Sequence, residues 1–138
     1  MDKYIKKFPS GHGKSESVYA YPEGGYCYIH GCHCIITDIE PPFKALATGD
    51  HNAKKMLSTM TTPIEIPSLK ELRKSKEDTV ELAEHVLFSR QYLIDLISVL
   101  GDCKAYWNGT IHNSHGFWTD GLRLVSDKGE ALLCGIRA

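Results

Sequence analysis

The segment 89–101 carries the pattern that most constrains how this chain can fold. Ser89 is a residue type that favours a helix N-cap, and Gly101 is one that ends helices. Between them, apolar side chains recur at helical spacing and fall on one face. These side chains belong to Leu93, Leu96, Ile97 and Leu100. The pattern predicts one amphipathic helix over residues 90–100, packed against another layer.

The residues before this helix leave two interpretations open. Alternation of apolar and other side chains is typical of a β-strand, and such a strand would lead directly into the helix. The alternating residues are Val80, Leu82, Val86 and Phe88, with Glu84 as a break. The alternative is a single long helix over residues 77–100, because the spacing is also compatible with heptads.

Most of the remaining chain is predicted to form antiparallel strands. The apolar-rich runs 26–29 and 32–37 flank His30-Gly31, a pair that favours a two-residue hairpin turn. Further strand-like runs cover 103–107, 117–125 and 131–137. Short helical segments are expected at 43–46, 53–57 and 69–73. The expected fold class is therefore α+β, a mainly antiparallel sheet with one amphipathic helix and short helical segments.

Length and composition favour a single domain. The 138 residues are 42% hydrophobic and 24% charged, as in ordinary globular proteins, and leave little room for a second core. Residues 1–17 are polar and rich in Gly, Ser and Lys. We expect them to form a polar segment, free to move, ahead of one α+β domain over residues 18–138.

Charge and hydropathy exclude two classes of protein. Lys and Arg number 16 and Asp and Glu 17, which excludes a strongly basic nucleic-acid binder at the level of the whole chain. The apolar runs are too short for a transmembrane helix, and the N-terminus lacks the apolar core of a signal peptide. We therefore expect a cytoplasmic protein without membrane contact, whose 5 cysteines are reduced.

Potential zinc ligands cluster within a few residues, at Cys27, His30, Cys32, His33 and Cys34. No Cys-x₂-Cys pair occurs among them. With His30-Gly31 as the hairpin turn, strand parity places the three cysteines and Ile29 on one face, and His33 on the other. This arrangement favours a core of small apolar side chains over a metal site. A metal site would have to recruit His12, His112 or His115.

Two further motifs give no support for an enzyme. The segment 11–15 ends like a phosphate-binding loop, but Phe8 occupies the place of its first glycine and no helix follows. The segment 112–115, near Asp120, contains two histidines but lacks an accompanying nucleophile or carboxylate pair. We interpret it as an exposed loop, assign no catalytic residue and expect no cofactor.

Basic residues form one local cluster. Lys70, Arg73 and Lys74 fall on one face of a short predicted helix, and Arg90 opens the long one. These four residues are candidates for DNA binding through salt-dependent phosphate contacts. The alternative is a solvated face, because acidic residues at 71, 77 and 78 reduce the local potential.

Two segments resemble the second half of a domain from the sliding-clamp family, which includes the bacterial DNA polymerase III beta subunit. In 86–96, a strand ending in Phe88 leads into a helix with a Tyr-Leu pair, as in the family. In 129–137, the closing strand has Cys and Gly where the family has Met and Pro. The resemblance implies that the helix from Arg90 faces DNA and that four residues lie near a peptide-binding groove. These are Cys134, Gly135, Ile136 and Arg137.

The resemblance covers less than half of the chain. A complete clamp domain carries two βαβββ units, and the first half of this chain shows a hairpin without an equivalent helix. The leading hypothesis is a clamp-like accessory factor, without enzymatic activity, that binds DNA or replication proteins and can form a homo-oligomer. The rival is a small cytoplasmic binding protein from a phage or mobile element, with a protein or small-molecule ligand. A metal-dependent enzyme that uses the His/Cys cluster is the third hypothesis.

Overall fold

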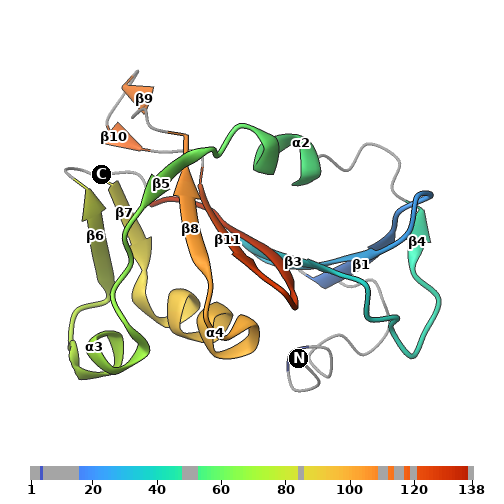
Figure 1. Cartoon of the computed structure of the whole chain (residues 1–138), viewed down its shortest axis with the longest axis horizontal. Coiled ribbons are helices and arrows are strands. Elements are labelled where there is room, and N and C mark those ends of the chain that lie inside the picture. The colour runs from blue at the N-terminus through green and yellow to red at the C-terminus, as the bar shows by residue number, and fades with distance from the viewer. Residues whose placement is uncertain are drawn as a thin grey trace.

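The computed structural model describes residues 4, 16–47, 53–83, 86–108, 112–113, 117–118 and 121–136 (Figure 1). Its main feature is an eight-stranded sheet in the order β4-β1-β2-β3-β12-β11-β8-β5. Neighbouring strands are antiparallel except β4, which runs parallel to β1. The strands are β1 Glu16–Ala20, β2 Tyr26–His30, β3 His33–Thr37, β4 Leu46–Ala47, β5 Thr62–Ile64, β8 Lys104–Trp107, β11 Leu122–Ser126 and β12 Gly129–Leu133.

Two small hairpins and three helices complete the described structure. One hairpin pairs β6 (Thr79–Ala83) with β7 (Val86–Ser89), and the other pairs β9 (His112–Asn113) with β10 (Phe117–Trp118). The helices are α2 (Ala53–Ser58), α3 (Leu69–Lys74) and α4 (Arg90–Leu100). The expected α+β class with a mainly antiparallel sheet is confirmed.

Helix α4 forms where the sequence predicts it. The Ser89 side chain accepts a hydrogen bond from the amide of Tyr92, and the amide of Gly101 donates to Ile97. Leu93 and Leu96 are fully buried, in the core cluster that also contains side chains of β11 and β12. The helix contacts β11 and β12 of the sheet and both strands of the β6–β7 hairpin. It therefore covers one face of the sheet.

The other face of the sheet carries a second, smaller core under α2, which lies on the side opposite α4 in Figure 1. Leu57 of α2 and the adjoining Met60 bury their side chains against it. The sheet contributes Cys27, Cys34 and Leu132. The two faces thus have separate apolar partners, as the alternation of side chains along the strands requires.

The region before α4 settles the choice between the two interpretations. Residues 79–83 and 86–89 are strands that pair as a hairpin, so the predicted strand character is confirmed, in two strands instead of one, and the long helix was wrong. The pairing register brings Val80 opposite Phe88, which places these two apolar residues together. The amide of Arg90 donates to the carbonyl of Asp78 at 3.0 Å, so the hairpin closes at the start of α4.

The β2–β3 turn lies one residue later than predicted. His30 pairs with His33, so the turn consists of Gly31 and Cys32, with Gly31 at φ 60°. Ile29 consequently pairs with Cys34, and Cys32 lies in the turn on the same side of the sheet as Cys34 but is exposed instead of buried. The left-handed conformation suits glycine at the first turn position, which fixes this register.

Three other predictions need correction. The expected helical turn at 43–46 is absent, because Leu46 and Ala47 pair with the edge of β1 as β4. The predicted strand 117–125 is divided between β10 and β11, and the last predicted strand ends at Leu133. Of the predicted polar segment 1–17, the structure describes Tyr4, which is 1% exposed in the main core, and the first residues of β1. No helix in the described part of the chain is long and apolar enough to span a membrane.

Candidate functional site

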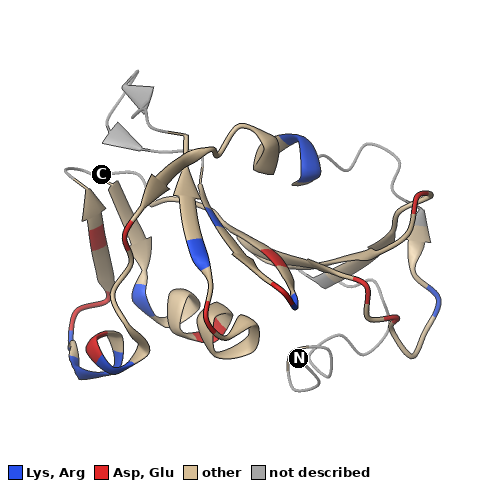
Figure 2. Cartoon of the chain, viewed as in Figure 1, with Lys and Arg blue, Asp and Glu red and all other residues tan. Residues whose placement is uncertain are grey.

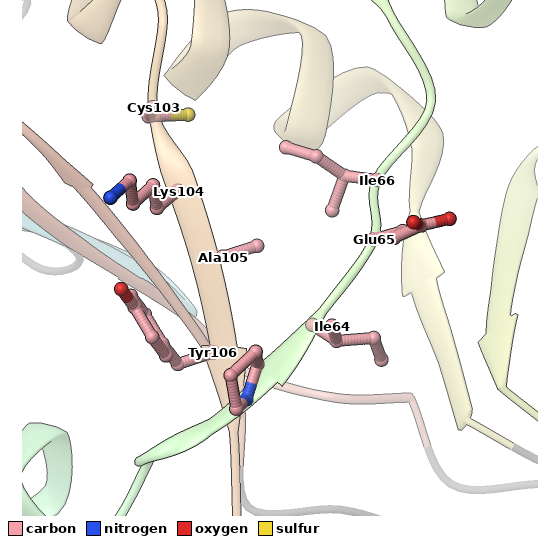
Figure 3. Close-up of a pocket in the computed structure, with 8 residues that line it drawn as sticks. Ile64, Glu65, Ile66, Cys103, Lys104, Ala105 and Tyr106 are labelled. Atoms are coloured by element: carbon pink, nitrogen blue, oxygen red, sulfur yellow. The ribbon is translucent and has the colours of Figure 1, made fainter.

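A cavity lies where β5 leaves β8 at one edge of the sheet. The two strands pair from Thr62 and Trp107 to Ile64 and Ala105, and then diverge. A cavity of about 550 Å³ opens between residues 63–66 and 103–106 (Figure 3). This volume lies within the range of ordinary ligand-binding pockets.

A second cavity of about 310 Å³ continues the first toward the start of α3 and the end of α4. The two cavities share Ile66 and Cys103 in their walls. Together they form an elongated depression, the edge groove, with residues 63–69 on one side and Ile97 and residues 101–106 on the other. Its length along two extended segments favours an extended occupant over a compact one.

Apolar side chains form part of the inner walls of the edge groove. Figure 3 shows the side chains of Ile66, Cys103 and Ala105 between the two segments, while Lys104 and Tyr106 point to the other side of β8. Burial, followed by the nearby carboxylate of Asp102, raises the pKa of the Cys103 thiol. The thiol is therefore neutral near pH 7 and contributes to an apolar wall.

The local sequence explains why β5 and β8 separate. Pro63 lacks an amide hydrogen and is therefore suited to the outermost strand. Pro67 restricts Ile66 to extended conformations. Ser68 then starts α3 through a capping box with Glu71, which redirects the chain away from β8. These residues are close together in sequence, so the divergence is locally encoded.

The predicted DNA-binding residues lie together at the α3 end of the molecule. Lys70, Arg73 and Lys74 are exposed on α3, and Nη2 of Arg73 lies 3.4 Å from the Ser98 hydroxyl of α4. In Figure 2, basic and acidic positions are interspersed along α3 and the loop after it. Glu71 shares the helix with these three basic residues.

Arg90 differs from the other three basic residues because its guanidinium faces the protein backbone. Nε donates to the carbonyl of Glu77 at 2.5 Å, and Nη1 donates to the carbonyl of Leu72 at 3.0 Å. These contacts join the start of α4 to α3 and to the loop that follows it. The observed role of Arg90 is therefore to hold these elements together.

The predicted peptide-binding segment connects the main sheet to the β6–β7 hairpin. The amide of Cys134 donates to Cys32, and that of Ile136 donates to Leu87 at 2.9 Å. Cys134, Gly135 and Ile136 are half-buried, whereas Arg137 lies outside the described residues. A cavity of about 150 Å³ lies beside Cys134, between α2 and the β2–β3 turn.

The predicted Cys/His cluster is divided between the two faces of the sheet. Cys27 and Cys34 are buried under α2, as expected. His33 is buried on the opposite face, where its Nδ1 lies 3.2 Å from the Tyr4 hydroxyl and its ring stacks on that of His30. A hydrogen bond with Cys27 and burial raise the pKa of Cys34. Among the described residues, no group of three His, Cys, Asp or Glu side chains is placed to hold a metal ion.

Several predicted motifs lie outside the described residues. These are the segment 11–15 with His12, and His115 and Asp120 of the second histidine motif. His112 is described only as part of β9. The chain matches no protein-family model, no curated protein and no solved structure. The edge groove was not predicted; the signal that points to it is the short segment with two isoleucines between Pro63 and Pro67.

Proposed function

We propose that this chain is a binding protein without enzymatic activity, whose edge groove holds an extended apolar segment of a partner protein. The observation that carries the proposal is the divergence of β5 from β8, which leaves an elongated groove with apolar side chains on its inner walls at the edge of the sheet. Proteins commonly bind extended peptides by adding a strand at such an edge.

The walls of the groove indicate the chemistry of the segment. Ala105 of β8 and Cys103, the residue before β8, project into it, and Ile66 faces them from the other side. A strand whose apolar side chains alternate matches this spacing. The pairing of β8 with β5 ends at Ala105. The backbone of β8 before Ala105 therefore offers a free edge, to which the bound segment can form main-chain hydrogen bonds.

We favour a replication protein as the partner. In this proposal the chain is a clamp-like accessory factor in the cytoplasm. Two observations support this choice. The segments 86–96 and 129–137 resemble the sliding-clamp family, and β7, α4, β8, β11 and β12 follow one another as a strand, a helix and three strands, with β9 and β10 inserted. The clamp hypothesis further predicts a homo-oligomer, and mass measurement in solution distinguishes it from a monomeric binding protein.

Selection of random heptapeptides displayed on phage against the full chain tests the proposal. We expect enrichment of peptides with alternating apolar residues. A fluorescein-labelled copy of the most enriched peptide then serves as the probe in anisotropy titrations. Cys103→Phe, which fills the groove where its two cavities meet, should weaken binding by at least about tenfold, or about 1.4 kcal/mol.

Cys103→Ser is the matched control, because it preserves the size of the side chain. It should bind the peptide within about threefold of the wild type, a difference below 1 kcal/mol. Circular dichroism verifies that both variants fold, and Ile66→Ala, which removes the opposite wall, gives an independent variant. Equal peptide affinity in the wild type and the three variants would show that the peptide binds outside the edge groove, and would overturn the proposal.

A second candidate function is DNA binding, supported by the exposed Lys70, Arg73 and Lys74 on α3. Side chains at this spacing project from neighbouring positions of one helix face and can contact successive phosphates. The edge groove begins at the N-terminus of the same helix, at Ser68 and Leu69. DNA and a protein segment would thus bind to adjoining surfaces, and the salt dependence of duplex binding tests the DNA contact separately.

A further inference from the structure

Cys32 and Cys134 lie opposite each other at the end of the β3–β12 ladder. The ladder pairs Leu132 with Cys34 and Leu133 with His33, so the next opposed pair is Cys134 and Cys32. The amide of Cys134 donates to the carbonyl of Cys32 at 2.8 Å, which continues the antiparallel pairing. Opposed residues in a hydrogen-bonded antiparallel pair have Cα atoms about 5.5 Å apart. Disulfides span Cα separations of about 4.4–6.8 Å.

The two thiols also share one face of the sheet. Both side chains line the small cavity beside α2, together with Cys34 and Leu132. Cys32 is exposed in the β2–β3 turn, and Cys134 is half-buried behind it. Burial, followed by the proximity of Cys32, raises the pKa of Cys134. The proximity of Cys32 agrees with the position given by the strand register.

We propose that Cys32 and Cys134 form a dithiol site that low-molecular-weight disulfides oxidise to a reversible cross-strand disulfide. The exposed Cys32 attacks first. Its thiolate displaces one half of the reagent disulfide, which leaves as a thiol with the proton lost from Cys32. The product is a mixed disulfide on Cys32.

Cys134 completes the reaction. Its thiolate attacks Sγ of Cys32, the mixed disulfide breaks, and the second half of the reagent leaves as a thiol with the proton of Cys134. The two protein thiols lose two electrons and two protons in total, and the reagent disulfide gains them. Cys27 and Cys34 are buried under α2 and are therefore shielded from a soluble reagent.

The disulfide would also restrain the position of the C-terminal segment. That segment connects the main sheet to the β6–β7 hairpin through the hydrogen bond from Ile136 to Leu87. A covalent link at Cys134 restrains the segment two residues before Ile136. We therefore expect slower amide hydrogen exchange at Ile136 in the oxidised protein than in the reduced protein.

The test treats the full chain with oxidised glutathione, alkylates the remaining thiols and measures the intact mass. We expect the wild type to form one disulfide, with the loss of two hydrogens from its thiols. A peptide map should show that this disulfide links Cys32 to Cys134. Cys134→Ser should stop at the mixed disulfide and gain one glutathione on Cys32. Cys103→Ser, in the edge groove and outside the β3–β12 ladder, is the matched control and should form the same link as the wild type.

Three outcomes would overturn the proposal. They are a stable glutathione adduct on Cys32 in the wild type, a disulfide that includes Cys27 or Cys34, and no reaction at Cys32 while Cys103 is modified. After oxidation, excess reduced glutathione should restore both free thiols. Failure of that reversal would contradict the reversible character of the site.

Discussion

Nη1 of Arg90 donates a hydrogen bond to the carbonyl oxygen of Leu72 at 3.0 Å, and this contact joins the first residue of α4 to the last turn of α3. The last four carbonyls of a helix have no partner within it, and that of Leu72 is one of them. Nε of the same guanidinium donates to Glu77 in the loop after α3. One side chain thus satisfies two backbone acceptors and holds α3, the loop after it and the start of α4 together.

Arg90→Ala should therefore lower the free energy of unfolding. Hydrogen bonds that involve a charged group contribute about 1.5–3 kcal/mol, and this range is our expectation for the variant in urea unfolding. Lys70→Ala, at an exposed position of α3, should change the same quantity by less than about 0.5 kcal/mol. Equal, small changes in both variants would contradict the structural role of Arg90.

The parts of the fold that were predicted from sequence are those determined by nearby residues. Helix α4 has its cap at Ser89, its apolar stripe and its stop at Gly101 within a short segment. The capping box of Ser68 and Glu71 is equally local, and α3 forms where it predicts. Strand parity likewise placed Cys27 and Cys34 on one buried face.

Pairings between distant segments were not predictable in the same way. The residues around Thr62 explain why β5 separates from β8, but nothing near them in sequence indicates that Thr62 pairs with Trp107. The edge groove depends on that pairing, and so does the opposition of Cys32 and Cys134 on the β3–β12 ladder. A shift of one residue in the β2–β3 turn was enough to move Cys32 from the predicted core to the surface.

The apolar face of α4 gives a second stability prediction. Leu96 is fully buried against the sheet, so Leu96→Ala should lower the free energy of unfolding by about 2–5 kcal/mol. Gln91 is exposed and donates to Asp95 at 3.0 Å within the helix. Gln91→Ala should therefore change the free energy of unfolding by less than about 0.5 kcal/mol. Similar changes in the free energy of unfolding for the two variants in urea titrations would mean that the buried face of α4 is assigned wrongly.

The turn between β11 and β12 depends on glycine at position 129. Its φ is 149°, and a Cβ there would clash with the carbonyl oxygen of Ile36. Gly24 also has a positive φ, 107°, but a Cβ there meets nothing within 4 Å. Gly24→Ala should cost about 1–3 kcal/mol from backbone strain alone. Gly129→Ala should cost more in the same thermal unfolding measurement, and a smaller cost would contradict the close approach to Ile36.

The burial of Tyr28 leads us to expect a loss of stability at alkaline pH. It is buried, its hydroxyl donates to Ile39 at 2.8 Å, and burial raises its pKa from 10.0 to about 12. Below about pH 10 the phenol is neutral in both states, and above it the unfolded chain loses the proton first. The stabilisation is therefore complete below pH 10 and decreases as the pH rises toward 12.

Urea unfolding across this pH range measures the effect. Tyr28→Phe should show a shallower decline of the unfolding free energy than the wild type, because its side chain has no proton to lose. Burial also raises the pKa of Tyr4 and Tyr21, so part of the decline should remain. Tyr92→Phe, at an exposed tyrosine, is the control and should follow the wild type. A decline in Tyr28→Phe as steep as in the wild type would exclude Tyr28 as a source.

The last prediction concerns DNA binding by α3. Each phosphate that a basic side chain neutralises on duplex DNA contributes about −0.9 to the slope of log affinity against log salt concentration. Lys70, Arg73 and Lys74 are exposed, so three contacts should give a slope of roughly −2 to −3. Fluorescence anisotropy with a labelled duplex, from low to moderate salt, measures it. Lys74→Ala should flatten the slope by about one unit and leave sequence preference unchanged.

Two controls separate this contact from other effects of charge. Lys54→Ala removes a basic residue of α2, on the opposite face of the sheet, and should leave the slope unchanged. Arg90→Ala should also leave the slope unchanged in the folded protein, because its guanidinium is bound to the carbonyls of Leu72 and Glu77. A flatter slope in Arg90→Ala would show that this residue reaches phosphate when DNA is bound. Absence of binding at low salt and high protein concentration would remove DNA as a partner and leave the protein segment in the edge groove.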